Sequence, residues 1–392
     1  MLSFLRDAPV GAFRGFRGVR VRRTSDGISP CRTETEETKM ARKNRIHVPN
    51  GTYHVTSRLA ERAHWLRDPS FKDKVVSWIH GVAEFTGVQL LAWCVMDNHF
   101  HMLVYVPEVP EEYRLDPSES PDAYAFGMRP AECNPPLWSP AGDLPADAVP
   151  PRPPTGFTLP DDEMVRRLGA LYGEKRADAF ARRWERLRAK GQDSTVEAEK
   201  EPFLRRMYSL SPFVKTIKER IARHVNTTLE RSGHVFEGRF FSGLVEEGRG
   251  ACMASLYVDY NPVRAGMVAD AAEYRWCSFA AAHGGRYAES SRNGYARTFG
   301  KEWPEARAAI RRAFADVPDA EAGERVRSGE ERLRPSQLIH LRVPELSRGA
   351  YVAANVAFAA KTRARLAKGF PSASSGTLLK LVAMLDWKSA AA

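Results

Sequence analysis

The sequence is poor in cysteine and has no long apolar run. Its five cysteines are scattered over 392 residues and are never spaced C-x-x-C, which excludes a disulfide framework and a zinc site of the usual spacing. We therefore expect a reducing, cytoplasmic environment. No apolar stretch reaches the roughly 18–20 residues that span a bilayer. The arginine-rich start lacks the apolar core of a secretory signal, so we expect no membrane partner.

Positive charge is what the sequence has in excess. Lys and Arg number 59 against 48 Asp and Glu, which gives a net charge of +11 and a pI near 9.5. This balance favours a polyanionic partner, of which nucleic acid is the commonest; the alternative is a basic surface that only keeps the protein in solution. A hydrophobic fraction of 43% and a charged fraction of 27% are typical of a folded protein.

The first part of the chain alternates strand and helix patterns. Residues 52–59 (TYHVTSRL) alternate strong β-formers and predict a strand, and 71–87 carry apolar residues at helical spacing up to a glycine. Residues 88–96 and 99–106 predict two further strands joined by a turn. The order β–α–β–β predicts an α+β fold, an antiparallel sheet with helices packed on one face.

A different composition follows. Residues 107–160 are rich in proline and lose periodicity, which predicts an irregular, mobile insertion. Residues 161–173 begin with acidic residues suited to a helix N-terminus, and 175–191 continue as a charged helix. Together they predict a small helical excursion from the main domain.

The core pattern resumes near residue 203. Residues 211–233 predict a helix that is capped by Ser211 and ends at Gly233. Residues 234–246 predict a strand pair, and a helix at 249–260 is ended by Pro262. The long helix has one apolar face, made of Phe213, Ile217, Ile221 and Val225.

The predicted organisation has five parts. Residues 1–40 are expected to be a disordered basic tail, and Met40 is a natural beginning for the folded part. The parts are the tail (1–40), a first half-domain (41–107), the proline-rich and helical insertion (108–202), a second half-domain (203–285) and a C-terminal accessory helical region (286–392).

Two histidines are candidates for chemistry. His99 and His101 lie two apart on a predicted strand, so both side chains point to the same face. They follow the turn signal Asp97-Asn98, at a strand end where functional residues gather. Neutral imidazoles so arranged can share a metal ion, although His-x-His also occurs in purely structural strands.

A tyrosine cluster lies on the predicted helix at 249–260. Tyr257 and Asn261 are four residues apart and therefore share a helix face, with Tyr260 close by. A tyrosine hydroxyl needs help to act as a nucleophile because it titrates near pH ~10. The alternative for each tyrosine is packing in the core with its hydroxyl bonded.

Both clusters carry a resemblance to a known family. DNHFHMLV (97–104) resembles the histidine motif of the IS200-like transposases and their REP-associated relatives. GHVFEGRFFSGLVEEGRGACMASLYVDYNPVRAGMV (233–268) resembles their second block, and RWCSF (275–279) resembles the short aromatic segment that follows it. The resemblance covers roughly residues 45–107 and 203–282. Asp97 departs from the proline usual in this family, and the insertion between the two blocks is long.

The resemblance implies a function. It implies a sheet of the HUH, ferredoxin-like type, in which His99 and His101 bind Mg²⁺ or Mn²⁺ and Asn261 is a third metal ligand. Tyr257 would be the nucleophile that nicks DNA as an endonuclease and becomes linked to the 5′ phosphate. A later 3′-hydroxyl would rejoin the strands without ATP, which is the chemistry of DNA transposition and recombination. Tyr260 competes for the nucleophile's role.

Single-stranded or hairpin DNA is the partner that this reading implies. Family members act as monomers or as homodimers, and both remain open here, as does association with the nucleoid. We expect basic side chains to follow the phosphate backbone, although each could also be a solvated surface residue. They are Lys215, Lys218, Arg220, Arg223, Arg239 and Arg264.

Two other functions compete. The first is a domesticated DNA-binding protein of the same fold that no longer moves DNA. The second is a His-x-His metallo-oxygenase or hydrolase acting on a small molecule, which would need a carboxylate ligand near the histidines. The sequence offers only Asp97 and Asp259 for that purpose.

Overall fold

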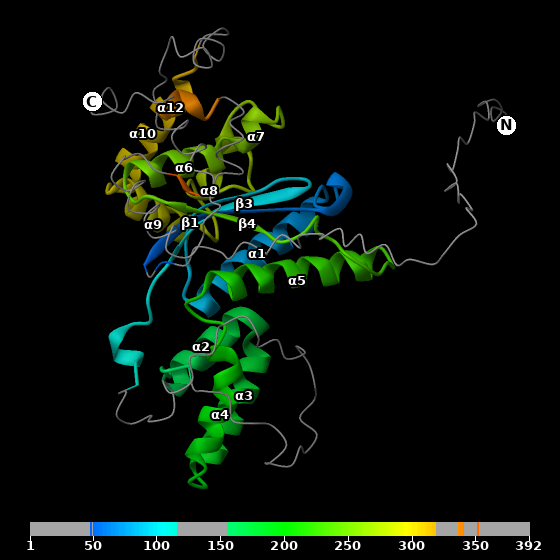
Figure 1. The fold of residues 1–392 in the computed structure, drawn as a ribbon, viewed down its shortest axis with the longest axis vertical. Helices are drawn as coiled ribbons and strands as arrows, with labels where there is room; N and C mark the ends of the chain where they lie inside the picture. Colours follow the sequence, from blue (N-terminus) through cyan, green and yellow to red (C-terminus); the bar gives the residue numbers. More distant parts are fainter. Residues whose placement is uncertain (1–47, 49, 116–154, 319–334, 341–350, 353–392) are drawn as a thin grey trace, which may run out of the picture. The chain divides into compact units, whose positions relative to one another are not determined.

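The computed structural model describes residues 48, 50–115, 155–318, 335–340 and 351–352 (Figure 1). All of these lie in one compact unit, residues 44–392. The predicted tail, most of the proline-rich stretch and much of the C-terminal region lie outside the described residues. Among the helices that are described, none is long and apolar enough to cross a membrane.

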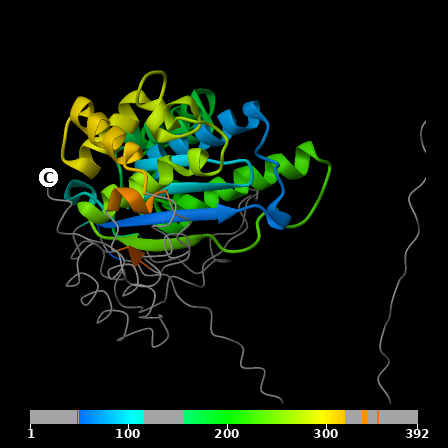
Figure 2. The ribbon, with the colours of Figure 1, turned by 90° about the horizontal axis from the view of Figure 1, so that it is seen from above.

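A sheet forms the centre of the fold. Its strand order is β2-β3-β1-β4-β5, with antiparallel pairs throughout except that β5 runs parallel to β4. Figure 2 shows β4 beside β1. The α+β fold is therefore confirmed. The strands are β1 (Gly51–Arg58), β2 (Gln89–Val95), β3 (His99–Val106), β4 (Phe241–Val245) and β5 (Tyr351–Val352).

One face of the sheet packs against α1 (Pro69–Thr86) and α5 (Leu210–Thr228). Asp68 caps α1 by accepting a hydrogen bond from the Phe71 amide at 2.8 Å. Gly87 ends α1 in the left-handed region, at φ 74°, as the sequence predicts.

Helix α5 is shorter than predicted. It ends at Thr228 instead of Gly233, and Glu230 then adopts a positive φ of 47°. Two consecutive threonines are poor helix formers because β-branching restricts their rotamers, so the helix ends before the glycine signal. The predicted apolar face of α5 is buried in the core.

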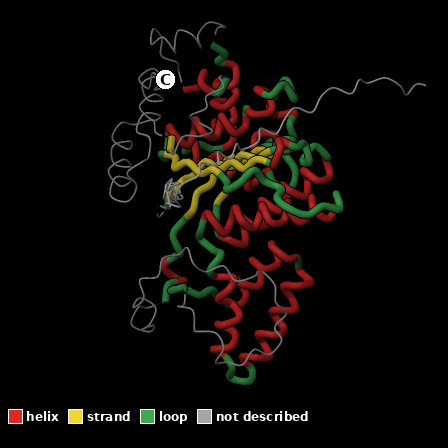
Figure 3. The backbone as a smooth tube through the Cα atoms, turned by 45° about the vertical axis from the view of Figure 1, so that its right-hand side comes forward, coloured by secondary structure: helices red, strands yellow, loops and turns green. Residues whose placement is uncertain are grey.

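The opposite face of the sheet is also covered by helices, which corrects the expectation of helices on one face (Figure 3). Strands β2 and β3 are buried on both sides because nearly all their residues are apolar. The covering elements are α6 (Arg249–Asp259), α7 (Asn261–Arg264), η3 (Ala271–Glu273), α8 (Ser278–Ala281), α9 (Ala288–Phe299), α10 (Trp303–Ala315) and α12 (Pro335–Leu338).

The described part of the insertion is helical. Helices α2 (Asp161–Tyr172) and α3 (Glu174–Arg188) agree with the prediction, whereas α4 (Asp193–Leu204) was missed. Pro202 near the end of α4 masks the helical pattern. Short 3-10 turns, η1 (Ala60–Arg62) and η2 (Glu111–Tyr113), follow β1 and β3.

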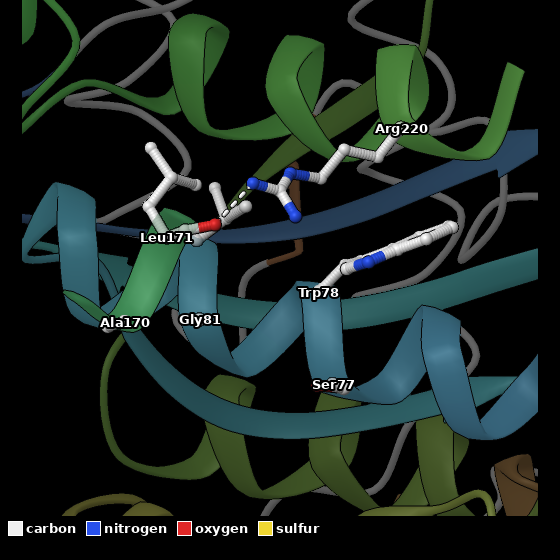
Figure 4. A pocket seen from close by; sticks show the side chains of 7 residues that line it. Ser77, Trp78, Gly81, Ala170, Leu171 and Arg220 are labelled. Carbon is white, nitrogen blue, oxygen red and sulfur yellow. Dashed lines mark hydrogen bonds between the residues drawn. The ribbon is translucent and has the colours of Figure 1, made fainter. Parts of the chain in front are cut away.

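A glycine permits the insertion to pack on the main domain. A Cβ atom at Gly81 of α1 would lie 2.5 Å from the carbonyl oxygen of Ala170 in α2. The two helices therefore approach so closely that only a hydrogen fits between them. Figure 4 shows this meeting of α1 and α2.

We expect Gly81→Ala to destabilise the protein by about 1–3 kcal/mol, because overpacking against a backbone oxygen outweighs the better helix propensity of alanine. Thermal unfolding measures the loss, and hydrogen exchange should show it concentrated in α2–α4. Gly284→Ala is the control, since a Cβ there meets nothing within 4 Å. Equal effects of the two substitutions would contradict the prediction.

Candidate active site

Three imidazoles share the sheet face that α6 covers. In the β1–β3 register Thr56 is opposite His101 and His54 is opposite Leu103, so His54 is a diagonal neighbour of His101 on the same face. The Nε2 atom of His54 lies 3.1 Å from the Nδ1 atom of His101, and their rings stack. The ring centroids of His99 and His101 are 4.9 Å apart.

Both motif histidines are neutral at physiological pH. Burial lowers the pKa of His99 to about 4, with the positive charges of Arg58 and Arg264 adding to the effect. Burial also holds the pKa of His101 well below its usual value. Neutral imidazoles keep a lone pair for a metal ion or a proton. The Oδ1 atom of Asn98 lies 2.6 Å from Nδ1 of His99 and orients that ring.

Helix α6 brings Tyr257 against these histidines. The centroid of its ring lies 5.9 Å from that of His101 and 5.8 Å from that of His54, edge-on in both cases. Its side chain is almost fully buried. A tyrosine and a histidine pair more than 150 positions apart in the sequence thus meet within one chain.

Arg264 covers the other side of the tyrosine. Its guanidinium carbon lies 4.1 Å from the centroid of the Tyr257 ring. The same guanidinium donates hydrogen bonds to Oδ1 of Asn261 and, at 2.9 Å, to the carbonyl of Ile339. The amide nitrogen of Asn261 donates to the Tyr257 carbonyl at 2.9 Å. Asn261 therefore fixes the end of α6 and holds Arg264 over the tyrosine.

Tyr260 has different surroundings. Its ring packs on Phe314 and His340, with centroid distances of 5.0 and 4.5 Å, and burial raises the pKa of its hydroxyl. Of the two competing tyrosines, Tyr257 is the one in ring contact with His54 and His101.

A buried lysine supports the turn before the histidines. Nζ of Lys72 on α1 lies 2.6 Å from Oδ1 of Asp97 and 2.8 Å from the hydroxyl of Tyr274, which in turn donates to the Val95 carbonyl. The lysine side chain is 3% exposed and the aspartate 20%. Asp97, which departs from the family pattern, thus anchors the turn through an ion pair.

We expect Lys72→Met to destabilise the protein by about 3 kcal/mol, because it leaves the Asp97 carboxylate and a buried hydroxyl without their donor. Urea unfolding measures the change. Lys74→Met on the exposed side of α1 is the matched control. A Lys72→Met protein as stable as the control would show that the ion pair does not stabilise the turn.

The predicted DNA-binding residues fall on separate surfaces. Four of them lie on α5, which packs on the sheet face opposite α6. Lys215 lies 3.7 Å from Glu219, and Lys218 donates to the Gly238 carbonyl at 2.6 Å. Arg223 and Arg239 are exposed. Of the six predicted residues, Arg264 is the one that contacts Tyr257.

A divalent ion would find two neutral imidazole donors here, from His99 and His101. The part of the chain that the structure describes contains no group of three or more His, Cys, Asp or Glu side chains arranged as a metal site. The amide oxygen of Asn261, the third predicted ligand, accepts from Arg264. The donor set therefore fits an ion that completes its coordination with phosphate and water oxygens.

Sequence reasoning missed two residues of this site. In the sequence His54 is only one residue of a predicted strand, and no pattern distinguishes Arg58, which pairs with His99 in the sheet register. The strand alternation places His54 on the even-numbered face of β1, but its pairing with His101 depends on the register. That register is a tertiary property.

One segment of the chain is similar to a known protein family. No curated protein matches the chain. A solved structure described as "Structure of the REP associates tyrosine transposase bound to a REP hairpin" aligns over 67% of this chain and 93% of that chain, at 12% identity and a TM-score of 0.34; a similarity this low supports no argument. Residues 47–111, which contain β1 to β3 and both motif histidines, match the family model of the IS200-like transposases. Over this segment the chain is similar to the IS200-like transposases.

Proposed function

We propose that this protein nicks and rejoins one strand of DNA, with Tyr257 as the nucleophile and Mg²⁺ or Mn²⁺ bound by His99 and His101. The observation that carries the proposal is the ring contact between Tyr257 and His101 within one chain, at 5.9 Å between centroids. Residues 47–111 match a family of transposases, and this contact supports the proposal that the nucleophile lies beside a histidine that would bind the metal.

In the proposed reaction the Tyr257 hydroxyl gives up its proton and its oxygen attacks the scissile phosphorus in line. The bond from phosphorus to the 3′ oxygen breaks, and that oxygen takes up a proton and leaves as a 3′-hydroxyl. The new phosphotyrosine linkage keeps the energy of the broken bond, so a later 3′-hydroxyl can attack it and rejoin the strands.

The surrounding side chains fit this reaction. IS200-like transposases generally depend on a divalent ion, which when bound draws charge from the phosphoryl oxygens. His99 and His101 would hold it, with Asn261 as the third ligand if its amide oxygen is shared with Arg264. The guanidinium of Arg264 lies over Tyr257, where a positive charge favours both a phenolate and a nearby phosphate.

DNA is the proposed partner, in single-stranded or hairpin form because one tyrosine cuts one strand. The residues proposed to hold its backbone are Lys215, Lys218, Arg220, Arg223, Arg239 and Arg264. One chain provides both imidazole and phenol, so the proposed chemistry requires no second subunit, although a homodimer is compatible with it.

Incubation with Mn²⁺ and labelled single-stranded hairpin DNA tests the proposal. We expect a protein–DNA adduct that survives a denaturing gel and disappears when EDTA is added. DNA binding without an adduct, over a range of hairpins and metals, would instead favour a domesticated DNA-binding protein.

His54 gives a prediction about metal binding. If His101 donates its Nδ1 hydrogen to His54, its Nε2 lone pair is left for the metal, and such partners of ligating histidines typically contribute 10–100-fold in metal affinity. We therefore expect His54→Phe, which keeps an aromatic ring but removes the acceptor, to weaken Mn²⁺ binding by about 10-fold or more. Calorimetric titration with Mn²⁺ measures this, and Tyr260→Phe is the control. Unchanged affinity would show that His54 only packs.

A further inference from the structure

A cavity lies among α1, α2 and α5, away from the candidate active site. Its volume is about 190 Å³. Figure 4 shows the Arg220 side chain reaching from α5 toward α2, with the Trp78 side chain beside it on α1. The remaining lining residues are Ser77, Gly81, Val82, Ala170 and Leu171. Arg220 donates a hydrogen bond to the Leu171 carbonyl, so the insertion forms one wall of this cavity.

Arg220 lines the cavity, and two further arginines, Arg206 and Arg223, lie near it. Arg223 lies three residues after Arg220 on α5 and therefore on the same side of that helix. Burial, and then the positive charges of Arg206 and Arg223, lower the pKa of Arg220. Arg206 donates to the Tyr172 hydroxyl at 3.0 Å and to the Thr216 hydroxyl at 3.2 Å. Among the described residues, none of the three arginines forms an ion pair with a carboxylate.

Four arginines of the neighbouring insertion differ in this respect. Each of Arg166, Arg167, Arg183 and Arg188 forms an ion pair with at least one Asp or Glu. Acidic residues are therefore abundant nearby, and the Arg206–Arg220–Arg223 cluster lacks them. Clustered like charges cost free energy that a bound anion offsets.

The cavity also offers a flat aromatic surface. Trp78 is half-buried and packs with Phe71 and His224 at centroid distances of 6.2 and 5.8 Å. Guanidinium groups bind phosphate through paired hydrogen bonds, and an indole stacks on a nucleobase. A single nucleotide unit of a nucleic acid strand combines these two features.

We propose that the cavity between α1, α2 and α5 binds one nucleotide of a single DNA strand, with its phosphate on the Arg206–Arg220–Arg223 cluster and its base on Trp78. Nucleic acid as the partner rests on the proposed function. The cavity belongs to the sheet face of α1 and α5, whereas Tyr257 belongs to the face of α6. The nucleotide bound here is therefore distinct from the one cut at Tyr257, and binding at the cavity is separable from the covalent step.

Equilibrium binding in a Tyr257→Phe background tests the proposal, because no adduct can then form. The probes are a fluorescein-labelled single-stranded oligonucleotide and the same strand with abasic sites. We expect Arg223→Ala to weaken binding of both strands about 10-fold and to reduce the slope of log K against log salt by about one. Arg307→Ala, on the exposed side of α10, removes the same charge and should change affinity less than twofold.

The substitution Trp78→Leu tests whether a nucleobase stacks on this side chain. This substitution should weaken binding of the complete strand about 10-fold and leave the abasic strand unaffected, and Trp78→Phe should restore most of the loss. Equal effects of Arg223→Ala and Arg307→Ala would overturn the phosphate site, and equal effects of Trp78→Leu on the two strands would overturn the stacked base. Arg223 is exposed, so its substitution leaves folding intact even if Trp78→Leu does not fold. If these effects occur while the wild-type protein forms no adduct, the cavity proposal stands and the proposed nicking function fails.

Discussion

Tyr257→Phe should abolish the covalent protein–DNA adduct while leaving DNA binding unchanged. Phenylalanine keeps the ring contacts with His54, His101 and Arg264 and removes only the hydroxyl that would attack phosphorus. The expected loss is complete, because no other group can take over an attack that requires in-line geometry at the phosphate. A denaturing gel with labelled hairpin DNA and Mn²⁺ measures the adduct, and fluorescence anisotropy measures binding.

Tyr260→Phe is the matched control for this experiment. It removes a hydroxyl from the same helix end, but its ring contacts Phe314 and His340. We expect this variant to form the adduct at close to the wild-type level. Loss of the adduct in Tyr260→Phe and its retention in Tyr257→Phe would assign the nucleophile to the other tyrosine and contradict the proposal.

Asp259→Asn should change how stability depends on pH. Asp259, two residues after Tyr257 on α6, is 1% exposed and accepts hydrogen bonds from the Ser278 hydroxyl at 2.6 Å and the Tyr295 hydroxyl at 2.7 Å. Burial raises the pKa of its carboxyl from 3.8 to about 7 in spite of these donors. The folded protein therefore binds a proton at this site more tightly than the unfolded chain does.

The direction of the effect follows from that difference. Because the folded-state pKa exceeds the unfolded-state value, the stabilising contribution is complete below pH about 4 and is lost as the pH rises through about 7. The wild-type protein should lose on the order of 4 kcal/mol of unfolding free energy from this group across that range. An asparagine does not titrate, so Asp259→Asn should remove this slope and should be more stable than wild type at pH 8.

Urea unfolding at several values of pH between 4 and 8 measures how the unfolding free energy of the wild type and of Asp259→Asn depends on pH. Asp162→Asn on the exposed side of α2 is the control that removes an equal charge without burial. A wild-type curve and an Asp259→Asn curve that stay parallel from pH 4 to 8 would show that the carboxyl does not titrate as its burial implies.

Much of the fold could be predicted from local patterns. The β1–α1–β2–β3 order was found because strand alternation, helical spacing and Gly87 are signals within a few residues. The C-terminal end of α5 and the whole of α4 were not predicted correctly, since threonine pairs and Pro202 gave conflicting local signals. The prediction of helices on one face of the sheet was also wrong, because an apolar strand pattern indicates burial but not which elements cover each face.

The candidate site was predictable only in part. The His99 and His101 spacing fixes two side chains on one face of a strand, because alternate residues of a strand point the same way. The role of Tyr257 came from the resemblance to a family, since no local rule connects a late helix to an early strand. No local sequence pattern indicates a role for His54 or Arg58, or predicts the ion pair between Lys72 and Asp97.

The sequence by itself determined the secondary structure around the site, the shared face of the two motif histidines and the positive charge that favours DNA. Tertiary structure alone decided that Tyr257 rather than Tyr260 contacts His54 and His101, and that α5 lies on the other side of the sheet from these histidines. The physical reason is that periodicity acts over one or two turns of chain, whereas the register of β1 on β3 and the packing of α6 on the sheet join residues up to two hundred positions apart. Those contacts depend on how whole faces fit together.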